Sequence, residues 1–409
     1  MMKMFAPFRG LTFEYKLMLF AAFVFNLGFY MLIPLLSHYL AQHLALSATL
    51  IGVVMGVRSF CQQGLFLAGG VLADKFGVKP LIIAGCLLRA VGFLLFLWAE
   101  QVEVLFLAAF LTGFAGALFT PAAQAYFSNA SGISKAQMFA LVGMARNAGE
   151  LLGPVCGLAL ISMSFALLCS VAALPFFCFA VVFMFGLHAP KKAPKSSELS
   201  THNLIQTVLS NRPFLQLCAV MMGYFMLINQ ISFAMPIFLG QFAMPLHSIT
   251  WLLCACALIS IIVQLPITAL SERINNDPMF ICTGLALMGI GFLVMLFEAQ
   301  NQWQLLIQLG LLALFFSVAT AMSLPLIMKY IANSAPSGTV STHYGFFYLF
   351  AGVGLIIGSV LAGYTLDLEQ TIPGLTWYLF AAIGSTSALA FLYLTMSTEK
   401  TPSPQHLKG

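Results

Sequence analysis

A glycine-rich stretch with two ionisable residues runs from Arg146 to Gly157 inside a long apolar segment. Glu150 is the one acid placed deep within such a segment, and Arg146 stands one helical turn before it. An ionisable side chain at membrane depth costs roughly 2.5–3.5 kcal/mol on insertion scales, so it usually faces a partner or a water-filled path. Glu150 is therefore the first candidate for a group that takes up and releases a proton.

Two interpretations of this pair stay open. Burial disfavours a charged carboxylate, whereas a neighbouring arginine favours it. Glu150 and Arg146 therefore fit either a proton-coupling site or a permanent ion pair that neutralises itself. A pair that opens and closes as a carrier changes conformation would combine both roles.

The glycines around this pair have helical spacing. Gly149, Gly153 and Gly157 fall at i, i+4 and i+8, which leaves one smooth helix face that another helix backbone can approach closely. Pro154 removes one backbone donor in the middle of the segment and permits a bend. The pattern predicts a close-packed, movable helix.

The composition places this stretch in a membrane. The chain has 409 residues, of which 61% are hydrophobic and 7% are charged, against about 25% charged in soluble domains. We expect an all-α integral membrane protein with twelve transmembrane helices. The expected spans are 17–37, 48–73, 80–99, 104–127, 138–162, 164–187, 214–239, 248–270, 279–298, 303–327, 343–366 and 374–396.

The positions of Lys and Arg set the orientation. With a cytoplasmic N-terminus, the basic loop residues all fall on the cytoplasmic side, which predicts that both termini lie there and that the protein is in the inner membrane. The basic, Pro- and Ser-containing segment 188–213 is the expected cytoplasmic linker between six-helix bundles at 1–187 and 214–409. Weak repeats, 72–77 with 270–275 and 149–153 with 354–358, indicate two pseudo-repeats.

Several classes of function are disfavoured. The net charge of +5 is spread over short loops, so we expect membrane lipid, and no nucleic acid, as a partner. The nine cysteines lie in apolar runs, which predicts neither a metal site nor a cofactor. We find no spacing of nucleophile, acid or base that would make an enzyme, and no phosphate-binding loop that would use ATP.

Two motifs now carry a resemblance. The run from Gly70 to Lys79 resembles the loop signature of the major facilitator superfamily, and 149–157 resembles its span-five antiporter motif. The run 56–64 with Arg89 looks most like the MdtH group of drug:proton antiporters. The resemblance implies a gate and a hinge. The implied gate residues are Gly70, Asp74, Lys75, Gly77 and Lys79, and the implied hinge residues are Gly149, Gly153, Pro154 and Gly157.

The chain departs from the family pattern at three positions. Val78 replaces a basic residue of the loop signature, and Leu158 stands where the span-five motif ends in glycine. Ala109 occupies the span-four position at which the superfamily has an arginine linked to proton coupling. Arg89 on span three is the candidate substitute, beside Glu150 and Arg146.

Polar residues within the spans are the candidates for binding a substrate. Arg58 and Gln62 lie one turn apart near the middle of span two, and the excess of arginines over acids at membrane depth favours an anionic group. Amides in spans are as often contacts between helices. The candidates are Arg58, Gln62, Asn26, Tyr30, Gln124, Tyr224, Asn229 and Gln230.

Together these features predict a proton-coupled secondary transporter that exports small amphipathic or drug-like molecules by alternating access, acting as a monomer. The alternative is an exporter of one anionic metabolite, such as a carboxylate siderophore or an organic acid. A membrane receptor or scaffold that transports nothing is the competing class.

Overall fold

Short polar residues fix where several helices begin. A side-chain oxygen placed just before an apolar run accepts a hydrogen bond from the backbone N–H three residues later, which satisfies one of the free donors of the first turn. Among the residues that the structure describes, five such caps occur, at Ser47, Ser164, Asn211, Asn276 and Asn301. Each cap lies between a loop and a span, so the local sequence determines where these helices begin.

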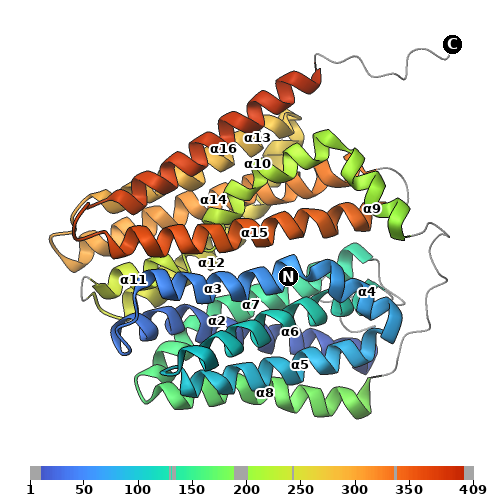
Figure 1. The fold of residues 1–409 in the computed structure, drawn as a ribbon, viewed down its shortest axis with the longest axis horizontal. Helices are drawn as coiled ribbons and strands as arrows, with labels where there is room; N and C mark the ends of the chain where they lie inside the picture. Colours follow the sequence, from blue (N-terminus) through green and yellow to red (C-terminus); the bar gives the residue numbers. More distant parts are fainter. Residues whose placement is uncertain are drawn as a thin grey trace.

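The computed structural model describes residues 11–128, 130, 135–187, 201–241, 244–335 and 339–399. Within these ranges all regular secondary structure is helical, and the helices form two bundles that lie side by side (Figure 1). The first bundle, the N-half, contains α2 (Phe13–Gln42), α3 (Ala48–Gly64), α4 (Phe66–Phe76), α5 (Val78–Leu95), η1 (Phe96–Trp98), α6 (Val102–Ser128), α7 (Lys135–Ile161) and α8 (Phe165–Gly186).

The second bundle, the C-half, follows the linker. Its helices are α9 (Thr201–Ser210), α10 (Arg212–Ile228), α11 (Ala234–Gln241), α12 (His247–Ile274), α13 (Asp277–Ile290), η2 (Gly291–Leu296), α14 (Gln302–Ser334), α15 (Val340–Asp367) and α16 (Leu375–Glu399). Part of the expected linker is thus the short helix α9, while residues 188–200 lie outside the described residues.

The expected twelve spans map onto these helices. Among the described residues, nine helices are long and apolar enough to cross a membrane, and the bent pair α3–α4 makes ten. The other two are α7, whose mean hydropathy is lowered by Arg146, Asn147 and Glu150, and the pair α10–α11. The fold is therefore the twelve-helix membrane bundle, with two six-helix repeats.

Two spans expected to be continuous are broken. Span two bends by 42° where α3 gives way to α4 at Leu65. Span seven is interrupted by a turn at Asn229–Phe233, so that α11 is a separate short helix. No proline explains either break, and apolar composition alone cannot reveal it, because both sides of each break are apolar.

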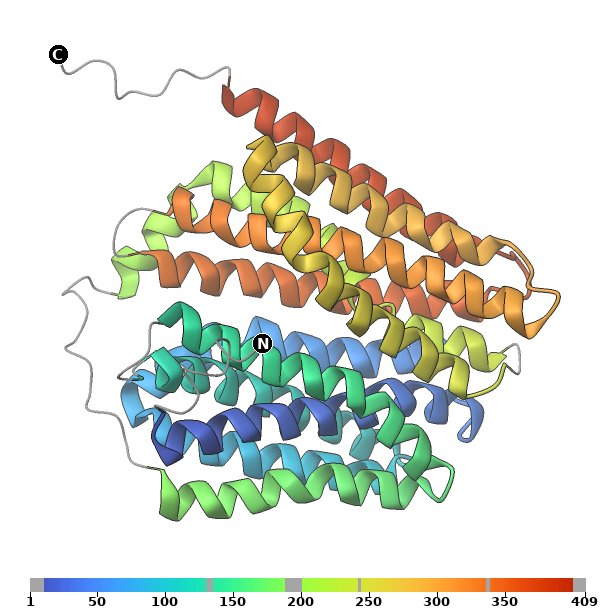
Figure 2. The ribbon, with the colours of Figure 1, turned by 180° about the vertical axis from the view of Figure 1, so that it is seen from behind.

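The long helices run in one common direction, and the bundle has two ends (Figures 1 and 2). The Asp367 end is the one that holds the last residue of α15 and the first residue of α3. The linker end is the opposite one, where α8 ends and α9 begins. These two names are used below.

Glycines allow pairs of helices to pack closely inside each half. A Cβ atom added to Gly153 would lie 2.8 Å from Tyr30 Cβ and 2.9 Å from the Leu27 carbonyl oxygen, so α7 packs directly on the backbone of α2. In the C-half, Gly354 holds α15 equally close to α10, 2.7 Å from the Met222 carbonyl oxygen. The two repeats therefore share this packing, in which small residues allow close backbone approach.

Candidate functional site

Glu150 lies at the middle of α7, where the two halves meet. The Tyr30 hydroxyl on α2 is within hydrogen-bonding reach of its carboxylate, and Arg146 acts on it through its charge. The neighbouring carbonyl oxygens of Leu151 and Pro154 accept hydrogen bonds from Cys254 and Thr250 on α12 of the C-half. Glu150 therefore lies on a helix that contacts both halves.

Arg146 faces a different environment. Its side chain is exposed, whereas Glu150 is partly buried, and its charge interacts with Tyr348 on α15. Arg146 also acts on Glu150 through its charge, so the two residues remain an interacting pair on α7.

Arg58 and Arg89 lie in the interior of the N-half. Only 4% of Arg58 is exposed; its guanidinium donates to Gln62 Oε1 at 3.2 Å and Ser59 Oγ at 3.3 Å, and its Cζ lies 5.0 Å from the centre of the Phe29 ring. The partners of Arg58 are thus neutral groups of α3 and an aromatic face of α2.

Arg89 has similar surroundings. It donates to the Thr112 carbonyl oxygen at 3.3 Å, and its Cζ lies 5.6 Å from the centre of the Phe176 ring. A Cβ atom on Gly116 would touch Arg89 and the Gln62 side chain, so this glycine makes room for both. The two arginines are thus held by an amide, a hydroxyl, a carbonyl and aromatic rings, all of them neutral groups.

Other substrate candidates of the N-half are placed apart. Asn26 donates to the Ala22 carbonyl oxygen of its own helix at 2.9 Å and lies against Gly149. Gln124 is exposed on α6. Asn26 thus joins Tyr30 and Glu150 at the contact between α2 and α7, and Gln124 does not.

The C-half candidates cluster around the break between α10 and α11. Tyr224 is 1% exposed, and its hydroxyl, like Gln230 Oε1, has no hydrogen-bond partner within the described part of the chain. Gln230 Nε2 donates to the Met226 carbonyl oxygen at 2.5 Å, and Asn229 ends α10. These three candidates therefore lie together at the break in span seven.

The implied gate residues surround the turn between α4 and α5. Gly77 has φ of 92°, in the left-handed region that favours glycine, which explains why the motif places glycine there. A Cβ atom on Gly70 would meet nothing within 4 Å. Lys75 is exposed and Lys79 is half-buried, and the side chain of Asp74 lies outside the described residues.

The hinge motif uses two faces of α7. Its glycines face α2, whereas the carbonyl oxygens of Leu151 and Pro154 face α12 and accept from Cys254 Sγ and Thr250 Oγ1, both at 3.4 Å. The proline and the glycines therefore serve different neighbours, one in each half.

Sequence reasoning missed the residues on the other side of this contact. Thr250, Cys254 and Cys256 were treated as ordinary apolar-span residues, although the i, i+4 spacing of the first two is that of one helix face. No role was predicted for Asp367. In both cases the sequence shows only a polar atom on or beside a span. Its role can be assigned only once the helix that it contacts is known.

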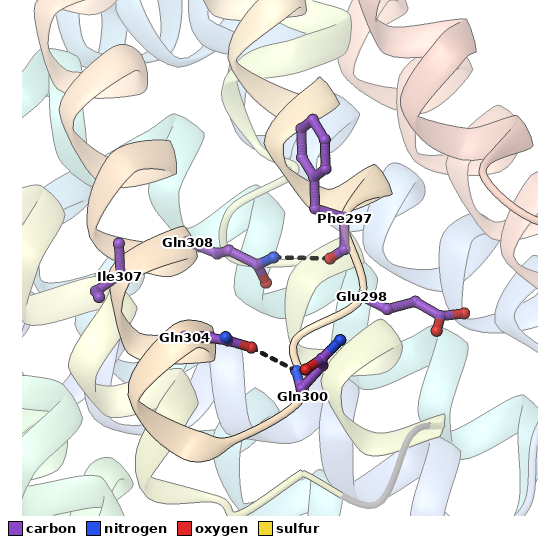
Figure 3. Close-up of a pocket in the computed structure, with 6 residues that line it drawn as sticks. All are labelled: Phe297, Glu298, Gln300, Gln304, Ile307 and Gln308. Carbon is purple, nitrogen blue, oxygen red and sulfur yellow. Dashed lines mark hydrogen bonds between the residues drawn. The ribbon is translucent and has the colours of Figure 1, made fainter.

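A shallow pocket occurs away from these residues (Figure 3). It is lined by the loop between η2 and α14, where Gln308 Nε2 donates to the Phe297 carbonyl oxygen and Gln304 Oε1 accepts from Gln300 N, each at 2.7 Å. The side-chain amides of Gln304 and Gln308 hold the loop closed through these bonds. This pocket, at the Asp367 end, is therefore part of a turn between two helices.

The chain resembles known transporters along its length. It is 35% identical over 375 residues to an uncharacterized MFS-type transporter of Mycobacterium tuberculosis, covering 90% of this chain and 89% of that one. It is 28% identical over 379 residues to the multidrug resistance protein MdtH of Salmonella typhi, covering 92% of each.

Solved structures agree in fold. The nucleoside transporter NupG superposes with a TM-score of 0.80 at 14% identity, covering 93% of this chain and 99% of that one. A peptide transporter, POT, in complex with sulfate gives 0.76 at 16% identity, covering 95% and 94%. The family model described as Major Facilitator Superfamily matches residues 18–246 and 217–409. The chain therefore belongs to the major facilitator superfamily and is a multi-pass membrane transporter.

Proposed function

We propose that the protein is a proton-coupled secondary transporter that exports small amphipathic or drug-like molecules across the inner membrane by alternating access. The observation that carries the proposal is the position of Glu150 on α7, where Tyr30 of the same half lies within hydrogen-bonding reach and the neighbouring Leu151 carbonyl accepts from Cys254 of the other half. Protonation removes a charge from the junction of the halves, so it changes how strongly they associate.

The moving units in this proposal are residues 1–187 and 214–409, joined by the 188–213 linker at the cytoplasmic face together with both termini. Gly149, Gly153 and Gly157 keep α7 fixed to α2, while Pro154 presents its carbonyl to α12. The gate motif would act at the linker end. One proton that crosses 100 mV releases about 2.3 kcal/mol, which is enough to drive export of a solute.

The test measures proton flux in proteoliposomes that contain the purified protein, with cationic, neutral and anionic solutes supplied in turn. Glu150→Gln is expected to abolish solute-dependent proton movement, because the amide keeps the shape and cannot ionise. Glu103→Gln, which changes an exposed acid at the start of α6, is the matched control and should transport normally. Normal proton coupling in Glu150→Gln would remove Glu150 from the mechanism.

A specific anionic metabolite is the second candidate. It is favoured by Arg58 and Arg89, whose hydrogen-bond partners are neutral, and by exposed Arg146 beside Tyr348. The same solute panel separates the candidates: transport of varied amphipathic cations supports the first, and transport confined to one carboxylate supports the second.

A further inference from the structure

Asp367 makes a concentrated set of contacts between the two halves. It is the last residue of α15, in the C-half, and its carboxylate meets the first turn of α3, in the N-half. Oδ1 accepts from Ala48 N at 2.7 Å, and Oδ2 accepts from Thr49 N at 2.9 Å and from Thr49 Oγ1 at 2.5 Å. One side chain thus ties two bundles together with three hydrogen bonds.

The first turn of α3 is completed by both halves. Its own cap, Ser47, accepts from Leu50 N and leaves the N–H groups of Ala48 and Thr49 free. These are the donors that Asp367 takes. A carboxylate beside a helix N-terminus is also stabilised by the positive end of the helix dipole, and hydrogen bonds to an ionised acceptor are the strong ones.

The position of Asp367 on its own helix points to the same role. A negative side chain at a helix C-terminus is disfavoured by the dipole of that helix. Within α15 alone, therefore, aspartate is a poor choice at 367, and the compensating interaction comes from α3.

The surroundings hold the two helices in register. A Cβ atom on Gly363 would touch the Ala48 carbonyl oxygen, so α15 and α3 are already in backbone contact one turn before Asp367. A second contact between the halves lies nearby, between His38 Nδ1 on α2 and the Pro236 carbonyl oxygen on α11, at 3.3 Å. Asp367 itself is exposed, so water can replace its bonds when the halves separate.

We propose that Asp367 is a positioning residue of the transport cycle, a latch that holds the Asp367 end closed and must release before that end opens. This inference rests on the proposed alternating access. The implied gate residue Asp74 belongs to the same helix pair, α3–α4 with α15, at the linker end. The two residues thus lie at opposite ends of one pair of helices.

The experiment measures distances across both ends in the full-length reconstituted protein. Spin labels are introduced through noncanonical amino acids, which avoids the native cysteines. One pair, at Gln101 and Gln370, spans the Asp367 end, and the other, at Phe76 and Ser210, spans the linker end. All four positions are exposed.

Asp367→Asn keeps the shape and removes the charge. We expect the population with a long Gln101–Gln370 distance to rise on the order of tenfold or more, because charge-assisted bonds are lost. The Phe76–Ser210 distance should shorten in the same molecules. Thr49→Val, which removes only the hydroxyl bond, should give a smaller shift in the same direction, and Asp367→Glu should restore part of the closed population.

Asp277→Asn is the matched control. It also removes a half-buried carboxylate partner, that of Lys329 at 2.7 Å, but within one half, and should leave both distances unchanged. A merely structural role for Asp367 would lower stability without moving the two distances in opposite directions.

Unchanged distances in both Asp367→Asn and Thr49→Val overturn the latch. If Asp367→Asn does not fold, the two distances in Thr49→Val alone test the latch. If the distances shift but the wild-type protein moves no protons with any solute, the latch stands and the proposed function fails. If transport is normal and the distances do not move, the proposed function stands and the latch fails.

Discussion

Two of the contacts between the halves, α3 with α15 and α7 with α12, are made by equivalent helices and differ in kind. The pair α3–α15 meets backbone to backbone along its length: Gly52 lies against Ser359, Gly56 against Ile356, and Gly352 against Gly64. The pair α7–α12 meets through two long hydrogen bonds of 3.4 Å, and α12 then slants away toward the linker end (Figure 2). Related repeats thus build one close and one loose interface.

The placement of glycine explains the difference. α3 and α15 carry glycines on the faces that they turn to each other. The glycines of α7 face α2 in its own half, and α12 contains no glycine, so its side chains keep the two backbones apart. In a bilayer, where packing replaces hydrophobic burial as the force between helices, this choice decides which interface is tight. The loose interface is the one that contains Glu150.

The largest effect is expected from filling the close interface. Gly52→Ala places a Cβ atom against the Ser359 carbonyl oxygen, at a separation that atoms do not tolerate, so α15 must move. We expect a loss of about 1–3 kcal/mol or more in stability and a strong fall in transport, measured by thermal unfolding and by solute flux.

Gly143→Ala makes the same change on α7, where the new atom meets nothing within 4 Å. It should be neutral or stabilising by up to about 1 kcal/mol. Equal behaviour of the two variants would contradict the contrast between the interfaces.

An intermediate effect is expected within the N-half. Gly153→Ala brings a Cβ atom 2.8 Å from Tyr30 Cβ, so α7 must shift by a few tenths of an ångström from α2. Stability should fall by about 1–2 kcal/mol. Proton-coupled transport should fall further than stability accounts for, because Tyr30 moves relative to Glu150. Transport and unfolding temperature at wild-type values would show that this face of α7 is not closely fitted.

The smallest effect is expected at the loose interface. Thr250→Val keeps the side-chain shape and removes one long hydrogen bond to Pro154, which should change stability by less than about 1 kcal/mol. The variant should favour separation of α12 from α7, detected as faster exchange of the α7 amides near Leu151. A loss of stability comparable to that of Gly52→Ala would mean that α7–α12 is as tight as α3–α15.

Much of the fold was readable from the sequence. Length, apolarity and the distribution of basic residues predicted twelve helices in two halves, because a membrane admits few alternatives for a long apolar chain. The breaks at Leu65 and after Ile228 were missed, since each depends on what packs against the helix at that point. The helix spacing of Gly149 and Gly153 predicted a close neighbour, and it could not say that the neighbour is α2.

The residues of the candidate site could be predicted from the sequence, but their arrangement could not. We selected Glu150, Arg146, Arg58 and Arg89 only because ionisable residues within spans are costly and therefore rare. The sequence by itself determined that these groups exist at membrane depth and that glycines accompany them.

Only the tertiary structure decided which groups meet. It placed Arg58 and Arg89 inside one half, Glu150 on a helix that contacts both halves, and Asp367 on the first turn of α3. The physical reason is that composition and spacing act along one chain. A contact such as Ala48 with Asp367 joins residues 319 positions apart, and it is set by how whole helices pack.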